Sequence, residues 1–386
     1  MHNMRHTKSS SPGNASSNNF ASPTFRTSYE RVGNAEAVID EKRNKPRIRR
    51  WIKRTVLISV AIVVIVGGVF GYELYSEASK LTNQPNPFSL FTSLLPQSPK
   101  ETNGRVNILL AGYSVGDPHH QGAQLTDSIM IISINPKTKS GVLLSVPRDL
   151  WIHIPGNGQS KINAAYEDGQ AENFNEPGYF LGGMGLLEKV VSQRFGVKFD
   201  YYALINYAAL RDAVNAVGGI TININSPDPR GIYDPYTHLK LPNGKVHLNG
   251  QQALDLARTR GDGPGSYGIP NNDFTRTQYQ QKMIVAIKDK ASSLSSFVNP
   301  ITVLKLVNAV GNNVKTDLKI GQMESLYSDV KGISNGSIKE VTLNNYNGHN
   351  LLANHYIDGQ DALIPADGLG NYGAIKTAVN NLLYGN

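Results

Sequence analysis

After residue 104 the chain alternates short apolar runs with longer amphipathic ones. The apolar runs of strand length are Val106–Leu110, Ile129–Ile134, Val142–Val146 and Ile220–Ile224. The runs with helical spacing are Leu186–Phe195, Tyr207–Val217, Gly250–Arg258 and Asp273–Lys290. Further helices are expected near Thr302–Val310, Met323–Val330 and Ala374–Leu383, and a further strand near Ile338–Leu343. This alternation predicts an α/β layer fold, and because no linker or charged block divides residues 105–386, we expect one domain there.

One apolar run, residues 55–72, is too long for a strand and carries no charge. Its 18 residues, "TVLISVAIVVIVGGVFGY", would span ~27 Å as a helix, close to the ~30 Å of a bilayer's hydrocarbon core. We therefore expect one transmembrane helix over residues 55–72. The alternative is a cleaved signal peptide, with Ser76 and Ala78 near the cut, but the segment that precedes it is long for that.

The positive charge of the chain is confined to one short segment. The formal net charge is +8, and eight Lys/Arg with no acidic residue lie between Lys42 and Arg54. The remainder is formally neutral, so a nucleic-acid partner is not expected. Because the basic segment precedes the apolar run and Glu73 and Glu77 follow it, the positive-inside rule places the N-terminus in the cytoplasm and the C-terminal domain outside the cell membrane.

The segments flanking the apolar run lack the pattern of a folded domain. Residues 1–54 are rich in Ser, Asn and basic residues, which predicts a disordered basic cytoplasmic tail. Residues 73–104 contain four prolines among Ser, Thr and Asn, which predicts an extracellular spacer. The chain has no cysteine, which excludes disulfides, thiolate metal sites and cysteine nucleophiles.

The loop between the first two predicted strands carries Asp117, His119 and His120, and it ends at Asp127. A carboxylate here suits a hard cation such as Mg²⁺, which takes few protein oxygens and completes its shell with water and phosphate. The alternative is a solvated turn in which Asp127 caps the backbone. Spacing alone leaves both interpretations open.

A second group of charges follows the third predicted strand, in "LLSVPRDLWIHIP". Pro147 ends the ladder pairing, so Arg148 would project from a rigid corner, and a guanidinium held in this way suits phosphate. The alternative is a surface pair between Arg148 and Asp149, which would contribute little. His153 alternates with apolar neighbours, which favours a structural position, and no role in the site is assigned to it.

A third group lies around a helix that begins near Asn249. This helix delivers Arg258 and Arg260 at its C-terminus, where the helix dipole favours cations whatever their function. The following helix carries Asp273, Arg276 and Gln280, whose spacing of three and four places them on one face. A polar start on a helix that later becomes apolar indicates a site.

Together these segments resemble the LytR–CpsA–Psr family of Gram-positive cell-envelope proteins. The resemblance rests on "RVNILLAG", "TDSIMIISINP", "LLSVPRDLWIHIP", "KINAAY", "LRDAVNAVGGITININ", "LNGQQALDLARTR" and "DFTRTQYQQ", in that order, within residues 105–386. It implies a three-layer α-β-α domain with a mixed central sheet. It also implies a Mg²⁺-dependent (or Mn²⁺-dependent) phosphotransferase that moves a glycopolymer from a polyprenyl-pyrophosphate carrier to peptidoglycan as a phosphodiester.

The resemblance also implies roles for particular residues. Arg148, Arg258 and Arg260 would contact the pyrophosphate; Asp273, Arg276 and Gln280 would complete the polar site; and Asp127 would bind the metal. The sequence departs from the family pattern where Ser114 replaces a metal-binding aspartate, which Asp117 could replace in turn, and where Tyr279 stands in place of a common arginine. These departures keep open an alternative, a membrane-anchored polyprenyl-phosphate or glycopolymer binding protein with little or no catalysis. The extracellular location argues against a third interpretation, a transcriptional regulator.

Overall fold

The computed structural model describes residues 97–114, 124–270, 272–293, 311 and 313–385. The predicted tail, the predicted transmembrane helix over 55–72 and the helix near Thr302–Val310 lie outside these residues. Within the described ranges, no helix combines the length and the apolar character needed to cross a membrane.

A mixed six-stranded sheet forms the centre of the described domain. Its strand order is β11–β6–β1–β2–β3–β12. The strands are β1 (Val106–Tyr113), β2 (Thr126–Asn135), β3 (Ser140–Val146), β6 (Tyr201–Asn206), β11 (Val314–Thr316) and β12 (Ile338–Thr342). β1 pairs antiparallel with β2 and parallel with β6, while β3 pairs antiparallel with β2 and parallel with β12. The expected α/β fold with a mixed sheet is therefore confirmed.

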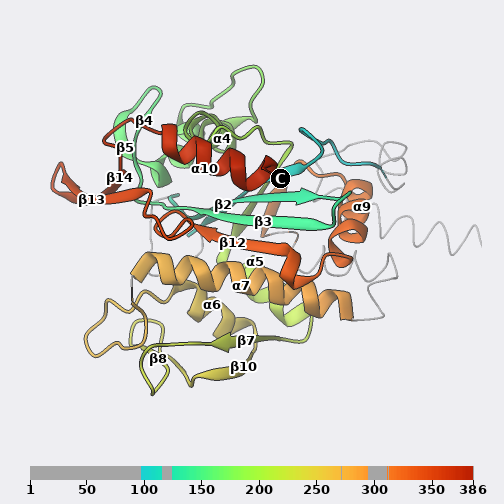
Figure 1. The fold of residues 1–386 in the computed structure, drawn as a ribbon, viewed down its shortest axis with the longest axis vertical. Helices are drawn as coiled ribbons and strands as arrows, with labels where there is room; N and C mark the ends of the chain where they lie inside the picture. The colour runs from blue at the N-terminus through green and yellow to red at the C-terminus, as the bar shows by residue number, and fades with distance from the viewer. Residues whose placement is uncertain (1–96, 115–123, 271, 294–310, 312, 386) are drawn as a thin grey trace, which may run out of the picture. The chain divides into compact units, whose positions relative to one another are not determined.

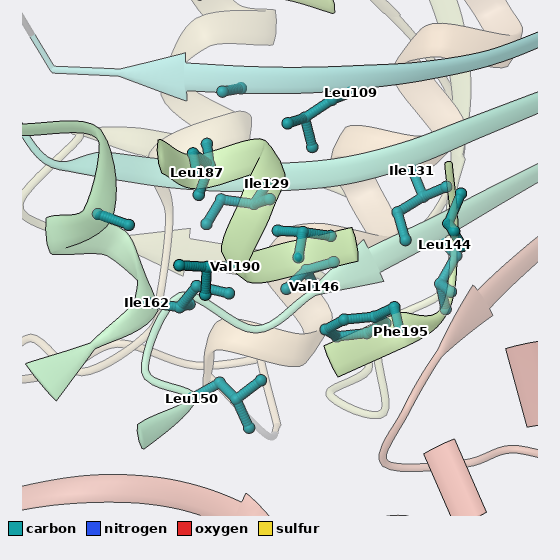
Figure 2. Close-up of a cluster of buried hydrophobic side chains, with 14 of the residues drawn as sticks. Leu109, Ile129, Ile131, Leu144, Val146, Leu150, Ile162, Leu187, Val190 and Phe195 are labelled. Carbon is teal, nitrogen blue, oxygen red and sulfur yellow. The ribbon is translucent and has the colours of Figure 1, made fainter. Parts of the chain in front are cut away.

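One face of this sheet packs against α3 (Ala165–Ala171), α4 (Gly182–Phe195) and α10 (Gly373–Tyr384). Alternate strand residues such as Leu109, Ile129 and Leu144 point to this face and are almost fully buried. Figure 2 shows them beside Leu187 and Phe195 of α4. Burial of these aliphatic and aromatic side chains supplies the main core of the domain.

On the other face, α5 (Tyr207–Ala216) and α7 (Asn272–Ser293) pack against the sheet, and α6 (Gly250–Arg258) packs against these two helices. Figure 1 shows α5 to α7 between the sheet and an outer ribbon. This ribbon comprises β7 (Ile220–Ile224) and β10 (Gly244–Leu248), next to a short hairpin of β8 (Ile232–Asp234) and β9 (Leu239–Leu241). A second apolar cluster joins these strands to the three helices, so helices lie on both faces of the sheet and strands add a further layer.

The remaining elements are η1 (Ile162–Ala164), the hairpin β4 (Trp151–Ile154) and β5 (Gly158–Lys161), α9 (Ile320–Lys331), η3 (Asn335–Ser337), and the hairpin β13 (Leu352–Ile357) and β14 (Gln360–Pro365). Of these, α9 packs against the sheet through Leu326, which shares an apolar cluster with Ile108 and Ile134. The end of the predicted spacer already packs on the domain, because the Lys100 backbone N–H donates to Tyr201 and Thr102 donates to Asp200.

Two asparagine caps fix where the helices of the second face begin. The side chain of Asn206, the last residue of β6, accepts a hydrogen bond from the Ala209 backbone N–H and starts α5 without a loop. Asn249 and Gln252 form a capping box at the start of α6. By fixing where α5 and α6 begin, these caps determine where Tyr207 of α5 and Arg258 of α6 lie.

Glu188 of α4 makes the stability of the domain depend on pH. Its side chain is buried and accepts a hydrogen bond from the Phe180 N–H at 2.7 Å. Burial raises the pKa of Glu188 from 4.5 to about 7, with Asp317 adding to the rise and the Phe180 N–H opposing it. Between these two pH values the unfolded chain releases the proton and the folded chain keeps it, so stability falls as pH rises and then levels off above about 7.

Glu188→Gln is therefore expected to stabilise the protein at pH 8, by on the order of 2–3 kcal/mol, and to leave it nearly unchanged at pH 4.5. Urea unfolding of the full chain at several pH values measures the difference, with the exposed Glu101→Gln as the control for loss of a carboxylate. A constant difference between Glu188→Gln and the parent across this range would contradict the assignment.

Candidate active site

A pocket of about 540 Å³ lies between the central sheet and helices α5 to α7. One end, which we call the charged end, is lined by Asp127, Asp234, Arg258, Arg260, Asp262 and Arg276. The other, the apolar end, is lined by Leu110, Met130, Ile205, Leu210, Met283 and Ile284.

The register of α7 on β2 separates the two ends. Arg276 donates to the Asp127 carbonyl at 3.0 Å, and one turn later Gln280 accepts from the Ser128 hydroxyl at 2.8 Å. α7 and β2 therefore run in the same direction from the charged end, and both become apolar further along, at Met283 and Met130. The pocket thus changes from charged to apolar along its length, which suits a ligand with a charged head and an apolar tail.

Arg148 forms ion pairs with three aspartates and is mostly buried, so it is more than one half of a surface pair with Asp149. Its side chain is 15% exposed, and its nearest partner is the carboxylate of Asp127. Its Nε lies 3.6 Å from an Asp149 oxygen and 3.4 Å from an Asp273 oxygen. Because Arg148 is absent from the pocket lining among the described residues, it acts on the pocket through Asp127.

Asp273 and the buried Arg276 form an ion pair at the start of α7. Arg276 Nη2 lies 2.6 Å from Asp273 Oδ1, and the Arg276 side chain is 5% exposed. As the spacing predicts, Asp273, Arg276 and Gln280 share one face of the helix. Asp273 lies behind the pocket, since the described lining includes Arg276 and Gln280 but not Asp273.

Burial and charge act against one another in this cluster. Burial raises the pKa of Asp273, although Arg276 and Arg148 oppose the rise. Burial lowers the pKa of Arg276, although Asp273 opposes that shift. Burial alone would lower the pKa of Arg148, but Asp273, Asp127 and Asp149 outweigh it and raise the pKa. Each charge in the cluster therefore depends on the presence of the others.

Arg258 and Arg260 reach the pocket from the end of α6. The Arg258 guanidinium lies over the Tyr207 ring, 4.9 Å from its centroid. Arg260 lies 3.9 Å from Asp262 and from Asp273. Long ion-pair distances of this kind leave the Arg260 head able to accept an additional anion.

Asp234 positions Arg260 and was not singled out by the sequence analysis. One of its oxygens accepts from the backbone N–H groups of Tyr236 and Thr237, and the other accepts from those of Arg260 and Gly261. The first pair forms an Asx turn, for which "DPYT" is a typical sequence signal. The hydrogen bonds from Arg260 and Gly261 join segments far apart in sequence, so no local sequence pattern predicts them.

The three expected metal ligands are only partly described. Ser114 is buried directly after β1, whereas Asp117, with His119 and His120, lies outside the described residues. No group of three or more His, Cys, Asp or Glu side chains suited to a metal occurs in the part of the chain that is described. Of the aspartates in the described lining, Asp234 has both oxygens occupied by backbone and Asp262 is 46% exposed, so Asp127 is the best-placed carboxylate.

The second departure from the family pattern does not alter the pocket. Tyr279 is buried and packs in the apolar cluster behind α7, and it is absent from the lining among the described residues. His153 is exposed on β4.

Comparisons with known proteins agree with these observations. The profile of the LytR_cpsA_psr family matches residues 69–367. A polyisoprenyl-teichoic acid–peptidoglycan teichoic acid transferase TagU of Enterococcus faecalis is 31% identical over 288 residues, which cover 74% of this chain and 84% of the relative.

Two solved structures share the fold. TagT bound to LI-WTA gives a TM-score of 0.55 at 22% identity, covering 74% of this chain and 94% of the other. The LytR-CPS2A-psr family protein YwtF (TagT) with bound octaprenyl pyrophosphate lipid gives 0.52 at 21% identity, covering 74% and 93%.

Arg276→Met is expected to destabilise the protein by about 3 kcal/mol, because it leaves the partly buried Asp273 carboxylate without its nearest cation. Asp273→Asn in the same chain should recover at least half of that loss, since it removes the unpaired charge. Urea unfolding of the two single variants and the double variant gives the coupling energy. Simply additive effects would contradict a mutually dependent pair.

Proposed function

The chain belongs to the LytR_cpsA_psr family, and from this membership and the pocket we propose that it transfers a glycopolymer from a polyprenyl-pyrophosphate carrier to peptidoglycan. The observation that carries the proposal is the passage from three arginines to an apolar end within one pocket. A polyprenyl pyrophosphate has this same division between a multiply charged head and a hydrocarbon tail. The relative TagU and the lipid-bound YwtF carry names that agree with such a ligand.

The polyprenyl chain would occupy the apolar end. Leu110 and Met130 offer it the surface of the sheet, and Leu210, Met283 and Ile284 offer it the helices. Burial of each methylene contributes about 0.8 kcal/mol. A pocket of about 540 Å³ holds the part of the chain next to the head and is within the usual range for a ligand site.

The pyrophosphate would lie at the charged end, against Arg258, Arg260 and Arg276. The acceptor hydroxyl attacks the phosphorus that bears the glycopolymer and releases its proton to solvent. The bond from that phosphorus to the bridging oxygen breaks, and polyprenyl phosphate leaves with the electron pair. The arginines stabilise the charge that develops on the transferred group and on the leaving phosphate.

Mg²⁺ or Mn²⁺ is the cofactor we propose, with Asp127 as the carboxylate ligand and Ser114 and Asp117 as further oxygen donors. These hard oxygen donors suit a cation that uses one or two carboxylates and completes its shell with phosphate oxygens. Bound there, the cation would neutralise charge on the pyrophosphate. Arg148 already pairs with Asp127, and this contact holds the carboxylate in place at the charged end.

We further propose that the domain acts at the outer face of the cell membrane, anchored by residues 55–72 with residues 1–54 in the cytoplasm. The uncharged run and the basic residues before it support this topology. It would place the pocket on the side where peptidoglycan lies.

The second candidate, a lipid or glycopolymer binding protein with little catalysis, is favoured by one observation. Ser114 supplies no charge, and Asp127 is already neutralised by Arg148. A weakened metal site of this kind would spare binding and reduce turnover.

The full chain, incubated with a polyprenyl-pyrophosphate-linked glycan and peptidoglycan, is expected to transfer the glycan only in the presence of Mg²⁺ or Mn²⁺. Arg258→Ala should lower kcat/KM about 100-fold or more, because it removes a charge that stabilises the transition state. Arg211→Ala on α5, which is outside the pocket lining, is the matched control and should retain activity. Tight lipid binding without turnover in any divalent metal would favour the binding protein.

A further inference from the structure

A second cavity, of about 600 Å³, opens beside the candidate active site. We call it the asparagine groove. It lies where the start of α7 meets the segment after β12 and the β13–β14 hairpin, and its lining comprises Phe274, Asn344, Asn345, Gly348, Asn350, Leu352, Asn354 and Leu363. It shares no lining residue with the pocket described above.

The lining of the groove is polar but uncharged. Four of its side chains are amides, and none is acidic or basic. A groove without charge offers nothing to balance a phosphate, whereas an amide both donates and accepts hydrogen bonds, as a hydroxyl does. The ligand that matches such a lining is neutral and rich in hydroxyl and amide groups.

The local hydrogen bonds orient these amides. Asn345 Oδ1 accepts from the Gly348 N–H at 3.2 Å, and Asn350 Oδ1 accepts from the Leu352 N–H at 3.0 Å. Each amide is thus held through its oxygen and keeps its N–H donors. Asn344 Oδ1 is buried and has no hydrogen-bond partner in the described part of the chain. A buried polar atom in this state calls for a partner, which a ligand hydroxyl would supply.

An exposed tyrosine extends the same surface. Tyr356 is 70% exposed and follows Asn354 by two residues on β13, so both side chains stand on one face of the hairpin. Leu363, which pairs with Asn354 across the hairpin, belongs to that face and lines the groove. A tyrosine ring offers a flat apolar face to the C–H groups of a sugar and a hydroxyl to its polar edge.

The groove adjoins the charged cluster around Arg148. Phe274 directly follows Asp273, and the Leu363 N–H donates to the Asp149 carbonyl at 2.9 Å. Both Asp273 and Asp149 lie within 3.6 Å of Arg148. The cluster therefore contacts pocket residues through Asp127 and Arg276, and it contacts groove residues through Phe274 and Leu363.

We propose that the asparagine groove binds an oligosaccharide, the glycan strand of peptidoglycan, and leads its acceptor hydroxyl to the charged end of the pocket. The sugar-binding part of this proposal rests on the residues of the groove alone. That the sugar is the acceptor rests on the proposed transferase function.

The binding is tested by titrating the full chain in detergent with a β-1,4-linked N-acetylglucosamine hexamer, which carries no phosphate, lipid or peptide. Tyr356→Ala and Asn354→Ala are each expected to raise Kd about three- to tenfold, through loss of a stacking surface and of an uncharged hydrogen bond. Leu181→Ala and Asn380→Ala, at exposed positions on or next to other helices, are the matched controls and should leave Kd unchanged. No binding, or equal effects in the controls, would overturn the proposal.

The transfer assay tests whether the sugar in the groove belongs to the peptidoglycan acceptor or to the lipid-linked donor. Tyr356→Ala should raise KM for the peptidoglycan acceptor and leave KM for the lipid-linked donor unchanged. An effect on the donor alone, or binding that requires the stem peptide, would overturn the acceptor assignment. If the parent chain transfers nothing, the proposed function fails, and the hexamer titration still decides whether the groove binds sugar.

Discussion

Hydrogen bonds of three α7 side chains, Arg276, Gln280 and Gln281, fasten the helix to the central sheet, and both cavities depend on that attachment. Arg276 donates to the carbonyl of Asp127 on β2. Gln281, buried on the adjoining face, donates to the Leu143 carbonyl of β3 and lies 2.9 Å from the Val341 carbonyl of β12. Hydrogen bonds to backbone that is already fixed in a sheet leave a helix little freedom to slide. The register of α7 therefore sets where its polar start and its apolar middle lie.

The register of α7 on the sheet also brings the charged side chains of the site together in a partly buried cluster. The buried Arg276 is held by Asp273, which in turn faces Arg148, and Arg148 holds Asp127. Such a chain of ion pairs contributes little net stability, because desolvation offsets much of the attraction. It does fix the positions of its members, and a phosphate site needs fixed guanidinium groups more than it needs stability. The neutral asparagine groove begins where this cluster ends, which separates a site for charge from a site for hydroxyl groups.

The sequence predicts the strands and helices that have a clear period and clear ends, such as β3, β7, α6 and α7. It misses β6, a central strand, because "YYALIN" runs into α5 without a turn and its parallel partner β1 is distant in sequence. In the site, spacing places Asp273, Arg276 and Gln280 on one face of α7. It gives no sign that Arg148 pairs with Asp127 or that Asp234 holds the backbone at Arg260, because the tertiary fold alone brings these residues together.

The central claim is that one pocket receives both the charged head and the apolar tail of a polyprenyl pyrophosphate. A structure of the full chain with this lipid bound tests it most directly. The account predicts pyrophosphate oxygens within hydrogen-bonding distance of Arg258, Arg260 and Arg276, and a hydrocarbon chain that passes Met130 toward Ile284. A lipid bound outside this pocket, or a head group away from the three arginines, would contradict it.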